Sequence, residues 1–396
     1  MSQARILLCH NYYQQRGGED ESFEAEADLL EANGHEVYLF TRHNDAIEDL
    51  TQLSVAGQTL WSRKAAQDLE AIIDSFQPTV MMCTNIFPLL SPAIYSQAKK
   101  QGVAVIQQLR NYRIFCVNGL FLRDQQACHA CLHKRVAWPG VMHRCYRDSR
   151  LASTLVAGWQ QSFWHTAVRK RGVDLFVAPT QYTRGVYVSG GIDADHISVR
   201  PIVTQPMSAD CLGEKQGYAV YVGRLSEEKG IASICEAWKI LAGMGIPLHI
   251  VGDGPEAPRV KAAADRGELI WHGWLDREKA LARIAKASVV LVPSICPEPF
   301  GRVVVESFAA GTPVIASEIG SLPELVQDGT NGLRFQAGDV QGLVTVVRRM
   351  FETKGMAAQL GQAALASYDE HYSQEQIYQL MLTQFEMAVG QSQAKA

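Results

Sequence analysis

Two glutamates, Glu298 and Glu306, carry the strongest chemical signal in the sequence, at the two ends of the segment EPFGRVVVE. The segment follows an apolar run, and we expect it to lead into a helix that ends near Gly311. A carboxylate in the loop before a helix can accept hydrogen bonds from sugar hydroxyls, and one on the helix can accept both hydroxyls of a ribose. Two exposed glutamates would be the simpler interpretation, but Glu306 lies between three valines and Phe308. The start of the predicted helix would in turn offer its N–H groups to a phosphate.

A glycine-bounded segment with two cations, GRLSEEKG at 223–230, directly follows another apolar run. A glycine at the end of a strand lets the chain turn closely. Arg224 could then reach one phosphate with its planar guanidinium group, and Lys229 a second phosphate as a point charge. The alternative is a solvated basic pair beside two glutamates. The segment 223–230 therefore supports a phosphate-binding site only in combination with the segment 298–306.

Two shorter segments follow further apolar runs. Gly252 and Asp253 open the sequence GDGP, which suits many tight turns. Trp274 and Leu275 follow a glycine, and their backbone could form the floor of a pocket for a base. A tryptophan buried in the core is the alternative for Trp274, and the sequence does not choose between the two.

The elements that would position these residues alternate along the chain. Short β-branched runs are separated by longer amphipathic stretches, which is the pattern of βαβ units in parallel sheets. Phe23, Ala27 and Leu30 have helical spacing between the first two runs, and Gly34 closes that helix. Ligands of such sheets bind at the carboxyl ends of the strands, where all four segments fall. The expected strands are 6–9, 37–40, 80–83, 103–107, 175–178, 197–199, 219–222, 248–251, 269–271, 289–292, 314–316 and 333–335.

Together these segments resemble the family 4 retaining glycosyltransferases. Residues 298–306 match the E-x7-E signature of that family, 223–230 is similar to its diphosphate-gripping loop, and Gly17 and Gly18 follow the first strand. The resemblance covers nearly the whole chain. It implies an α/β fold of the GT-B type, with two Rossmann-like domains facing each other across a cleft. It also implies transfer of a sugar from a nucleotide diphosphate, UDP or GDP, with retained configuration.

The resemblance assigns roles to individual residues. Glu298 would be catalytic and hold the donor sugar, Glu306 would hold the ribose, and Gly18 would let its loop close over the diphosphate. Because Arg224 and Lys229 would stabilise the leaving group, no cofactor is expected to be required for catalysis. The expected donor-binding residues are Gly18, Arg224, Lys229, Gly252, Asp253, Trp274, Leu275, Phe300, Gly301, Arg302 and Glu306.

The length of 396 residues favours two domains over one core. The stretch 203–216 has few helix or strand signals, and we take it as the linker. We therefore expect an acceptor domain over 1–203 with a Cys-rich insertion, and a donor domain over 214–372. Residues 373–396 are expected to pack as a closing helix.

The N-terminal half departs from the family pattern at Arg110. Relatives with this arrangement usually have a histidine in front of N-Y-R, and another before the Asn in a segment that here reads MMCTN. In the family a cleft histidine contacts the donor sugar, so Arg110 is the second candidate for a catalytic role. An arginine cannot act as a base, which fits a mechanism in which the leaving phosphate assists the incoming hydroxyl. It fits equally a different acceptor, or little activity.

Four of the nine cysteines cluster in the same half. Cys128 and Cys131 form a C-x2-C pair, and Cys116 and Cys145 flank it. A structural zinc ion with these four ligands would hold the long excursion between the strands in place. Reduced cysteines in a loop and a reversible disulfide are the alternatives.

Charge and composition argue against several functional classes of protein. With a net charge of −4 the chain lacks the excess of positive charge that is typical of nucleic-acid-binding proteins. Neither a long apolar run nor a signal-peptide pattern is present, so we expect a cytoplasmic protein. Arginines at 144, 147 and 150 with tryptophans nearby could face an acidic acceptor, or a lipid-linked one at the inner face of a membrane. More often such a mix is a solvated helix face with core aromatics.

We therefore predict a glycosyltransferase of polysaccharide biosynthesis that uses a nucleotide-sugar donor and a glycan or lipid-linked acceptor. The first alternative is a GT-B sugar-nucleotide epimerase, which would lack the combination of the diphosphate loop with E-x7-E. The second is a non-catalytic sugar-nucleotide-binding partner in a glycan assembly complex, which the missing histidines would suit. A dinucleotide oxidoreductase is disfavoured because no G-x-G-x-x-G follows the first strand.

Overall fold

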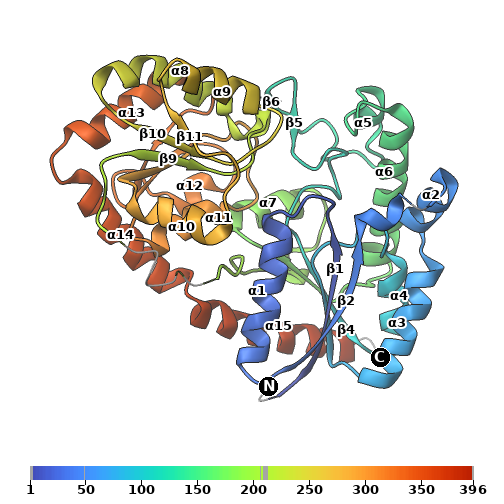
Figure 1. The fold of residues 1–396 in the computed structure, drawn as a ribbon. Helices are drawn as coiled ribbons and strands as arrows, with labels where there is room; N and C mark the ends of the chain where they lie inside the picture. The colour runs from blue at the N-terminus through green and yellow to red at the C-terminus, as the bar shows by residue number, and fades with distance from the viewer. Residues whose placement is uncertain (1–2, 49, 206, 208–212, 395–396) are drawn as a thin grey trace. The chain divides into compact units, whose positions relative to one another are not determined.

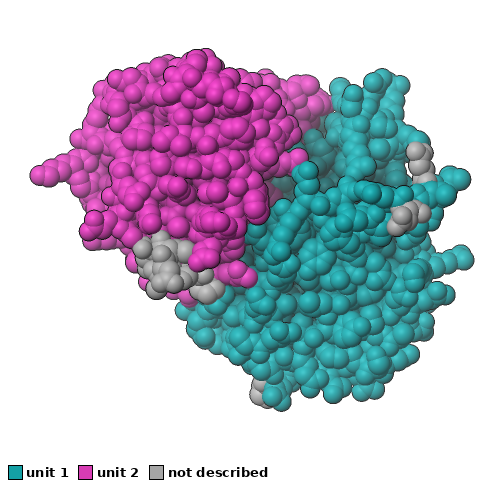
Figure 2. Space-filling model, viewed as in Figure 1, with its two compact units in different colours: residues 1–121, 129–203, 374–396 teal, residues 122–128, 204–373 magenta. Residues whose placement is uncertain are grey.

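The computed structural model describes residues 3–48, 50–205, 207 and 213–394, and it divides into two compact units. The first unit takes residues 1–121, 129–203 and 374–396, and the second takes 122–128 and 204–373 (Figure 2). Part of the expected linker, at 206 and 208–212, lies outside the described residues. Each unit is built around its own parallel sheet (Figure 1).

The sheet of the first unit has six parallel strands in the order β2-β1-β3-β4-β7-β8. All six strands expected in this half are present. They are β1 (Arg5–Tyr12), β2 (Glu36–His43), β3 (Val80–Cys83), β4 (Ala104–Gln108), β7 (Leu175–Ala178) and β8 (Ile197–Val199).

Both faces of this sheet are covered by helices, which explains why its strands are apolar almost throughout. Leu7 and Cys9 of β1 join a core with α3 and α4, whereas Ile6 and Leu8 join a core with α1 and α15. Successive side chains of a strand point to opposite faces, so one strand supplies both cores. The helices of this unit are α1 (Gly18–Ala32), α2 (Gln52–Leu60), α3 (Arg63–Phe76), α4 (Ala93–Lys100), α5 (Trp138–Met142), α6 (Arg150–Phe163), α7 (Gln181–Ser189) and α15 (Gln374–Gln393).

The excursion between β4 and β7 contains elements that the sequence did not predict. Two short antiparallel strands, β5 (Leu122–Arg123) and β6 (Gln126–Ala127), form a hairpin. After α6 the chain continues as one stretch of π-helix, Trp164–Arg169. Neither the hairpin nor the π-helical stretch has an apolar periodicity long enough to be recognised in the sequence.

The second unit has a six-stranded parallel sheet in the order β11-β10-β9-β12-β13-β14. The chain starts at β9 in the middle, runs to one edge, and returns to β12 on the other side of β9. The carboxyl ends of β9 and β12 therefore form the point where the strand order reverses, which is where open α/β sheets bind ligands. The strands are β9 (Ala219–Val222), β10 (Leu248–Val251), β11 (Ile270–Trp271), β12 (Val289–Val292), β13 (Val314–Ser317) and β14 (Gly332–Phe335).

All six strands expected in the second half are thus present, and the two sheets confirm the predicted α/β class. Among the described residues no helix has the length and apolar character needed to cross a membrane. The helices of the second unit are α8 (Ile231–Leu241), α9 (Ala257–Asp265), α10 (Arg277–Lys286), α11 (Arg302–Ala309), α12 (Leu322–Leu325), α13 (Val340–Glu352) and α14 (Met356–His371).

Candidate functional site

Loops at the carboxyl edge of the second sheet are joined to one another through their backbones. The N–H of Leu225, after β9, donates to the carbonyl of Asp253, after β10, at 2.9 Å. The N–H of Ile295, after β12, donates to the carbonyl of Glu228 at 2.9 Å. The segments singled out from the sequence therefore lie side by side at one edge of this unit.

Gly252 shows how closely these loops approach. Its φ is +139°, and a Cβ at this position would lie 1.9 Å from the carbonyl oxygen of Gly223. Its N–H donates to the carbonyl of Gly273 at 2.8 Å. Any larger residue would push the loops after β9 and β10 apart.

An ion pair joins the loops after β9 and β12. The Nζ atom of Lys229 lies 2.5 Å from Oε1 of Glu298, and the Ser294 hydroxyl donates to the same oxygen at 2.6 Å. The Glu298 side chain is 13% exposed. Burial by itself would lower the pKa of Lys229, but the adjacent Glu298 carboxylate raises it above its ordinary value. The ammonium group stays charged at the point where the strand order reverses.

Glu306 lies on α11 and accepts hydrogen bonds from two arginines. Its Oε1 is 2.8 Å from Nη2 of Arg302 and 3.0 Å from Nη1 of Arg277, the first residue of α10. Burial would raise the pKa of Glu306, but Arg302 and then Arg277 hold it below the usual range. Glu306 is thus a carboxylate fixed in its ionised form.

The start of α11 adds a further polar feature. The helix begins after Gly301, which has no side chain that could cap the N–H groups of the first turn. Helix N-termini of this kind bind anions through their N–H groups and the helix dipole. Phe300 is 3% exposed and belongs to the interior, so its side chain supports the loop from below.

Three other expected residues are open to solvent. Arg224 and Asp253 are exposed, and Trp274 is 74% exposed. The alternative in which Trp274 is a core tryptophan is therefore wrong. Leu275 beside it is half-buried. These side chains are free of the packing constraints that hold the two glutamates.

The structure adds two residues that the sequence analysis missed, Ser294 and Arg277. Ser294 follows β12 closely, and its position at a strand end was a usable signal. Arg277 had none, because it is separated by 29 positions from the Glu306 that it binds. Such pairing is set by how α10 packs against α11.

In the first unit, Gly18 is the first residue of α1, and the loop before it is held by a buried pair. Nε2 of His10, in β1, lies 2.8 Å from Oδ1 of Asp20, and Oδ2 of Asp20 accepts from the Gly17 N–H at 2.9 Å. Both side chains are at most 1% exposed. His10 and Asp20, which the sequence analysis did not combine, therefore fix the glycine loop.

Arg110 lies in a buried network of the same unit. Its Nη2 is 2.8 Å from Oε1 of Glu26, its Nη1 donates to the Ser22 hydroxyl at 2.7 Å, and its Nε donates to Gln108 at 2.6 Å. The Arg110 side chain is only 4% exposed, and Arg200 reaches Glu26 from another side at 3.0 Å. In this state the guanidinium group serves Glu26, and a catalytic role for Arg110 stays a prediction.

The four clustered cysteines do not assemble into a metal centre in the described part of the chain, where no group of three or more His, Cys, Asp or Glu side chains could hold an ion. Cys116 is buried, and its Sγ donates to Oδ1 of Asn118 at 2.9 Å. Cys128 is half-buried and Cys131 buried. The structure therefore gives the expected zinc site of Cys116, Cys128, Cys131 and Cys145 no support.

Comparison with known proteins finds a family match within the second unit. Residues 210–366 match the family model described as glycosyl transferases group 1. The glycogen synthase of Mycobacterium tuberculosis is 34% identical over 151 residues, 37% of this chain and 36% of that protein. The lipopolysaccharide core biosynthesis glycosyltransferase LpsE of Rhizobium meliloti is 30% identical over 160 residues, 39% of this chain and 46% of that protein. The chain thus spans less than half the length of these curated relatives.

Solved structures match over nearly the whole chain. A glycosyltransferase from Rickettsia africae has a TM-score of 0.70 at 14% identity, over 98% of this chain and 99% of that one. Anabaena HepE, in complex with UDP, has a TM-score of 0.66 at 18% identity, over 96% and 99%. At these identities the likeness shows the fold alone, which is of the GT-B class. The match to the group 1 glycosyl transferases is thus confined to residues 210–366 of the second unit.

Proposed function

We propose that the protein is a retaining glycosyltransferase, which transfers a sugar from a UDP- or GDP-linked donor to a glycan or lipid-linked acceptor. The observation that carries this proposal is the pair of polar clusters at the carboxyl edge of the second sheet. Lys229 and Glu298 meet at 2.5 Å beside the strand reversal, and Glu306 is held ionised by two arginines. Charges of both signs on one edge of the sheet would suit a donor in which a sugar is joined to a diphosphate and a ribose.

The donor would meet these residues in the order of its own parts. Lys229 and the exposed Arg224 would bind diphosphate oxygens, and the start of α11 would add its N–H groups. Glu298 would accept hydroxyls of the sugar, and Glu306 those of the ribose. Trp274, with Leu275, would lie against the base. The half-buried ion pair must then open, because Lys229 exchanges its carboxylate partner for a phosphate.

The chemistry follows from this placement. The bond between the anomeric carbon and the phosphate oxygen breaks, and a bond from that carbon to the acceptor oxygen forms on the same face. The hydroxyl proton passes to the leaving phosphate, so no protein base is required. Lys229 and Arg224 supply the charge that stabilises the leaving group, which is the largest contribution that fixed cations make to such a reaction.

Two features favour a UDP donor and an acceptor of cell-surface assembly. Anabaena HepE, which shares the fold, is described in complexes with UDP and with UDP-glucose. LpsE, similar to the second unit, is described as acting in lipopolysaccharide core biosynthesis. UDP-sugars are therefore the first donors to test, and cell-surface or lipid-linked glycans the first acceptors.

A lipid-linked acceptor also suits the surface of α5 and the start of α6. Trp138, Met142 and Leu151 are 57%, 56% and 78% exposed there. Arg144 and Arg147 are exposed in the connection between these helices. Exposed apolar side chains among cations are typical of proteins that contact anionic lipid surfaces.

A thermal-shift titration of the full chain tests the donor site. We expect UDP or GDP to raise Tm with EDTA present, and the shift to disappear in Glu306→Ala and Arg224→Ala. Arg266→Ala is the matched control, because Arg266 is an exposed cation of the same unit whose partner is Glu268. If no nucleotide of any class stabilises the wild type, the proposal fails.

A non-catalytic sugar-nucleotide-binding partner is the second candidate, and the position of Arg110 favours it. The residue at the family's histidine position is bound to Glu26 and 4% exposed, so it offers the donor sugar little in this state. Slow hydrolysis of UDP-sugar without acceptor separates the two candidates. Release of free sugar above the rate of Glu298→Gln would exclude the non-catalytic one.

A further inference from the structure

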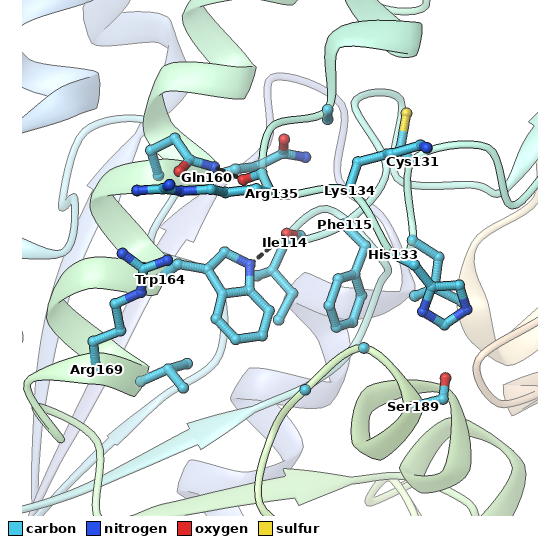
Figure 3. A pocket seen from close by; sticks show the side chains of 16 residues that line it. Ile114, Phe115, Cys131, His133, Lys134, Arg135, Gln160, Trp164, Arg169 and Ser189 are labelled. Carbon is cyan, nitrogen blue, oxygen red and sulfur yellow. Dashed lines mark hydrogen bonds between the residues drawn. The ribbon is translucent and has the colours of Figure 1, made fainter.

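A pocket of about 470 Å³ lies in the first unit, formed by the loop after β4, the second half of α6, the π-helical stretch and the turn after α7 (Figure 3). None of the residues assigned above to donor binding lines it. Its volume falls within the range of pockets that bind small molecules.

Two aromatic rings form the apolar wall. The rings of Phe115 and Trp164 lie side by side with their centroids 5.6 Å apart (Figure 3). The indole N–H of Trp164 donates to the carbonyl of Ile114 at 3.1 Å, which fixes the ring in place. Gly190 is required opposite Phe115, since a Cβ there would lie 2.2 Å from the Cζ atom of that ring. The wall is therefore built before any ligand arrives.

Three cations accompany these rings. Lys134, Arg135 and Arg169 line the pocket, and all three are exposed. The lining contains no aspartate or glutamate, and none of the three cations forms a salt bridge with a residue in the described part of the chain. The whole chain has a net charge of −4, so an unneutralised basic pocket is a local departure from its balance. Such a lining favours an anion.

The backbone around the pocket is arranged to present these groups. The π-helical turns Trp164–Arg169 begin with the aromatic residue and end with the cation. Stretches of π-helix are rare and occur frequently at functional sites. The Gln161 amide donates to the carbonyl of Arg135 at 2.6 Å, and the Gln160 amide donates to the carbonyl of Arg113 at 2.6 Å. These bonds tie α6 to the loop segments that carry the other pocket residues.

We propose that this pocket binds a sugar unit that carries an anionic group, a carboxylate or a phosphate, as part of the acceptor glycan. The apolar face of a pyranose ring stacks on Trp164, and the anionic group reaches Arg135 and Arg169, whose guanidinium groups bind such oxygens in pairs. The inference rests on the proposed transferase function, which it extends to the chemical class of the acceptor.

Binding measurements on the full chain test this inference directly. The probes are tetragalacturonate and glucose 1-phosphate, with maltotetraose as the neutral sugar and inorganic phosphate as the sugar-free anion. We expect both acidic sugars to bind at least tenfold more tightly than either control, and to weaken as salt rises. Binding of only one of them also upholds the proposal and names its anionic group. Equal binding of maltotetraose, or equal binding of inorganic phosphate, overturns it.

Variants separate this pocket from a general surface effect. Arg135→Ala with Arg169→Ala should weaken acidic-sugar binding at least tenfold. Arg63→Ala with Lys170→Ala removes the same charge from exposed sites outside the lining and should leave it unchanged. Trp164→Ala should also abolish binding. If the alanine variant fails to fold, Trp164→Phe, which keeps an aromatic ring, should fold and retain part of the binding. Equal losses in the two double variants would contradict the assignment.

Stabilisation by UDP, measured on the same samples, distinguishes the two proposals. If UDP does not bind and acidic sugars do, the proposed transferase function is contradicted and the proposed sugar-binding pocket is upheld. If UDP binds and acidic sugars do not, the proposed sugar-binding pocket is contradicted and the proposed transferase function is upheld.

Discussion

The Nζ atom of Lys229 lies 2.5 Å from Oε1 of Glu298, across the reversal point between β9 and β12. In the proposed donor site, the cation that would bind the diphosphate is thus paired with the carboxylate that would bind the sugar. Side-chain exposures of 33% and 13% leave the pair partly screened by solvent. A donor that brings both groups together can replace this ion pair by two better-matched contacts, whereas a free nucleotide replaces only half of it.

Glu298→Gln tests this exchange. We expect the variant to bind UDP at least as tightly as the wild type, because Lys229 no longer has a carboxylate partner. We also expect the rate of sugar transfer or donor hydrolysis to fall at least 100-fold, a barrier increase of about 3 kcal/mol. Calorimetric titration with UDP and steady-state rates provide the two readouts. Glu352→Gln, an exposed residue of α13, is the control, and a parallel loss of UDP binding in Glu298→Gln would contradict the exchange.

Arg277→Ala should make nucleotide binding sensitive to acid. Arg302 and Arg277 hold the pKa of Glu306 below its usual range, so the carboxylate is ionised above the ordinary value of a glutamate and is lost only when the pH falls through the lowered pKa. Removing Arg277 raises that pKa. The Kd for UDP, measured from pH 7 to pH 4, should therefore begin to rise at a higher pH than in the wild type.

The control for this titration is Lys279→Ala, which removes an exposed cation from the same helix, α10. Its pH profile should follow the wild type. A profile of Arg277→Ala that also follows the wild type would show that Glu306 does not bind the nucleotide in its ionised form.

All twelve expected strands were found because parallel strands covered on both faces are apolar throughout, as in the runs ILLC, VMMC and VVLV. The polar segments at their carboxyl ends were equally visible, because the chain must turn there. Glu298 and Lys229 could therefore be placed on one edge of a sheet from the sequence. That they form an ion pair could not, since 69 positions separate them.

Other features had no local signal at all. The bond from Arg277 to Glu306 depends on how two helices pack, and the burial of Arg110 depends on Glu26, 84 positions away. The spacing of the cysteines suggested a shared metal because C-x2-C pairs are common ligands. Spacing fixes only which residues are near in sequence, whereas the fold determines which side chains converge.

Arg110→Ala should act on stability. Glu26 is fully buried, and burial raises its pKa while Arg110 and then Arg200 lower it, with a net lowering. Removing Arg110 leaves this carboxylate with one cation less, which costs about 3 kcal/mol in the free energy of unfolding. Chemical denaturation of the full chain measures the loss. Arg5→Ala, which breaks the exposed pair with Glu36, should cost less than about 1 kcal/mol.

A second substitution separates the structural from the catalytic interpretation of Arg110. Glu26→Gln in the Arg110→Ala background removes the unpaired charge and should recover part of the lost stability. If stability recovers and turnover does not, Arg110 contributes to the reaction beyond the support of Glu26. If Arg110→Ala leaves turnover unchanged, the catalytic role is excluded.

His249 should make the second unit sensitive to acid. Its ring stacks on Tyr218 with centroids 4.1 Å apart, and burial, followed by His272 and Arg283, lowers its pKa from 6.5 to about 4. The folded state therefore stays neutral where the unfolded state takes up a proton. Because His249 is only half-buried and solvent screens part of the effect, the free energy of unfolding should fall by about 1 kcal/mol between pH 6.5 and pH 4, less than the full pKa shift would give. Denaturant titrations across this range should show a shallower fall in His249→Phe, which keeps the stacked ring. The exposed His371→Phe serves as the control, and an unchanged slope in His249→Phe would refute the assignment.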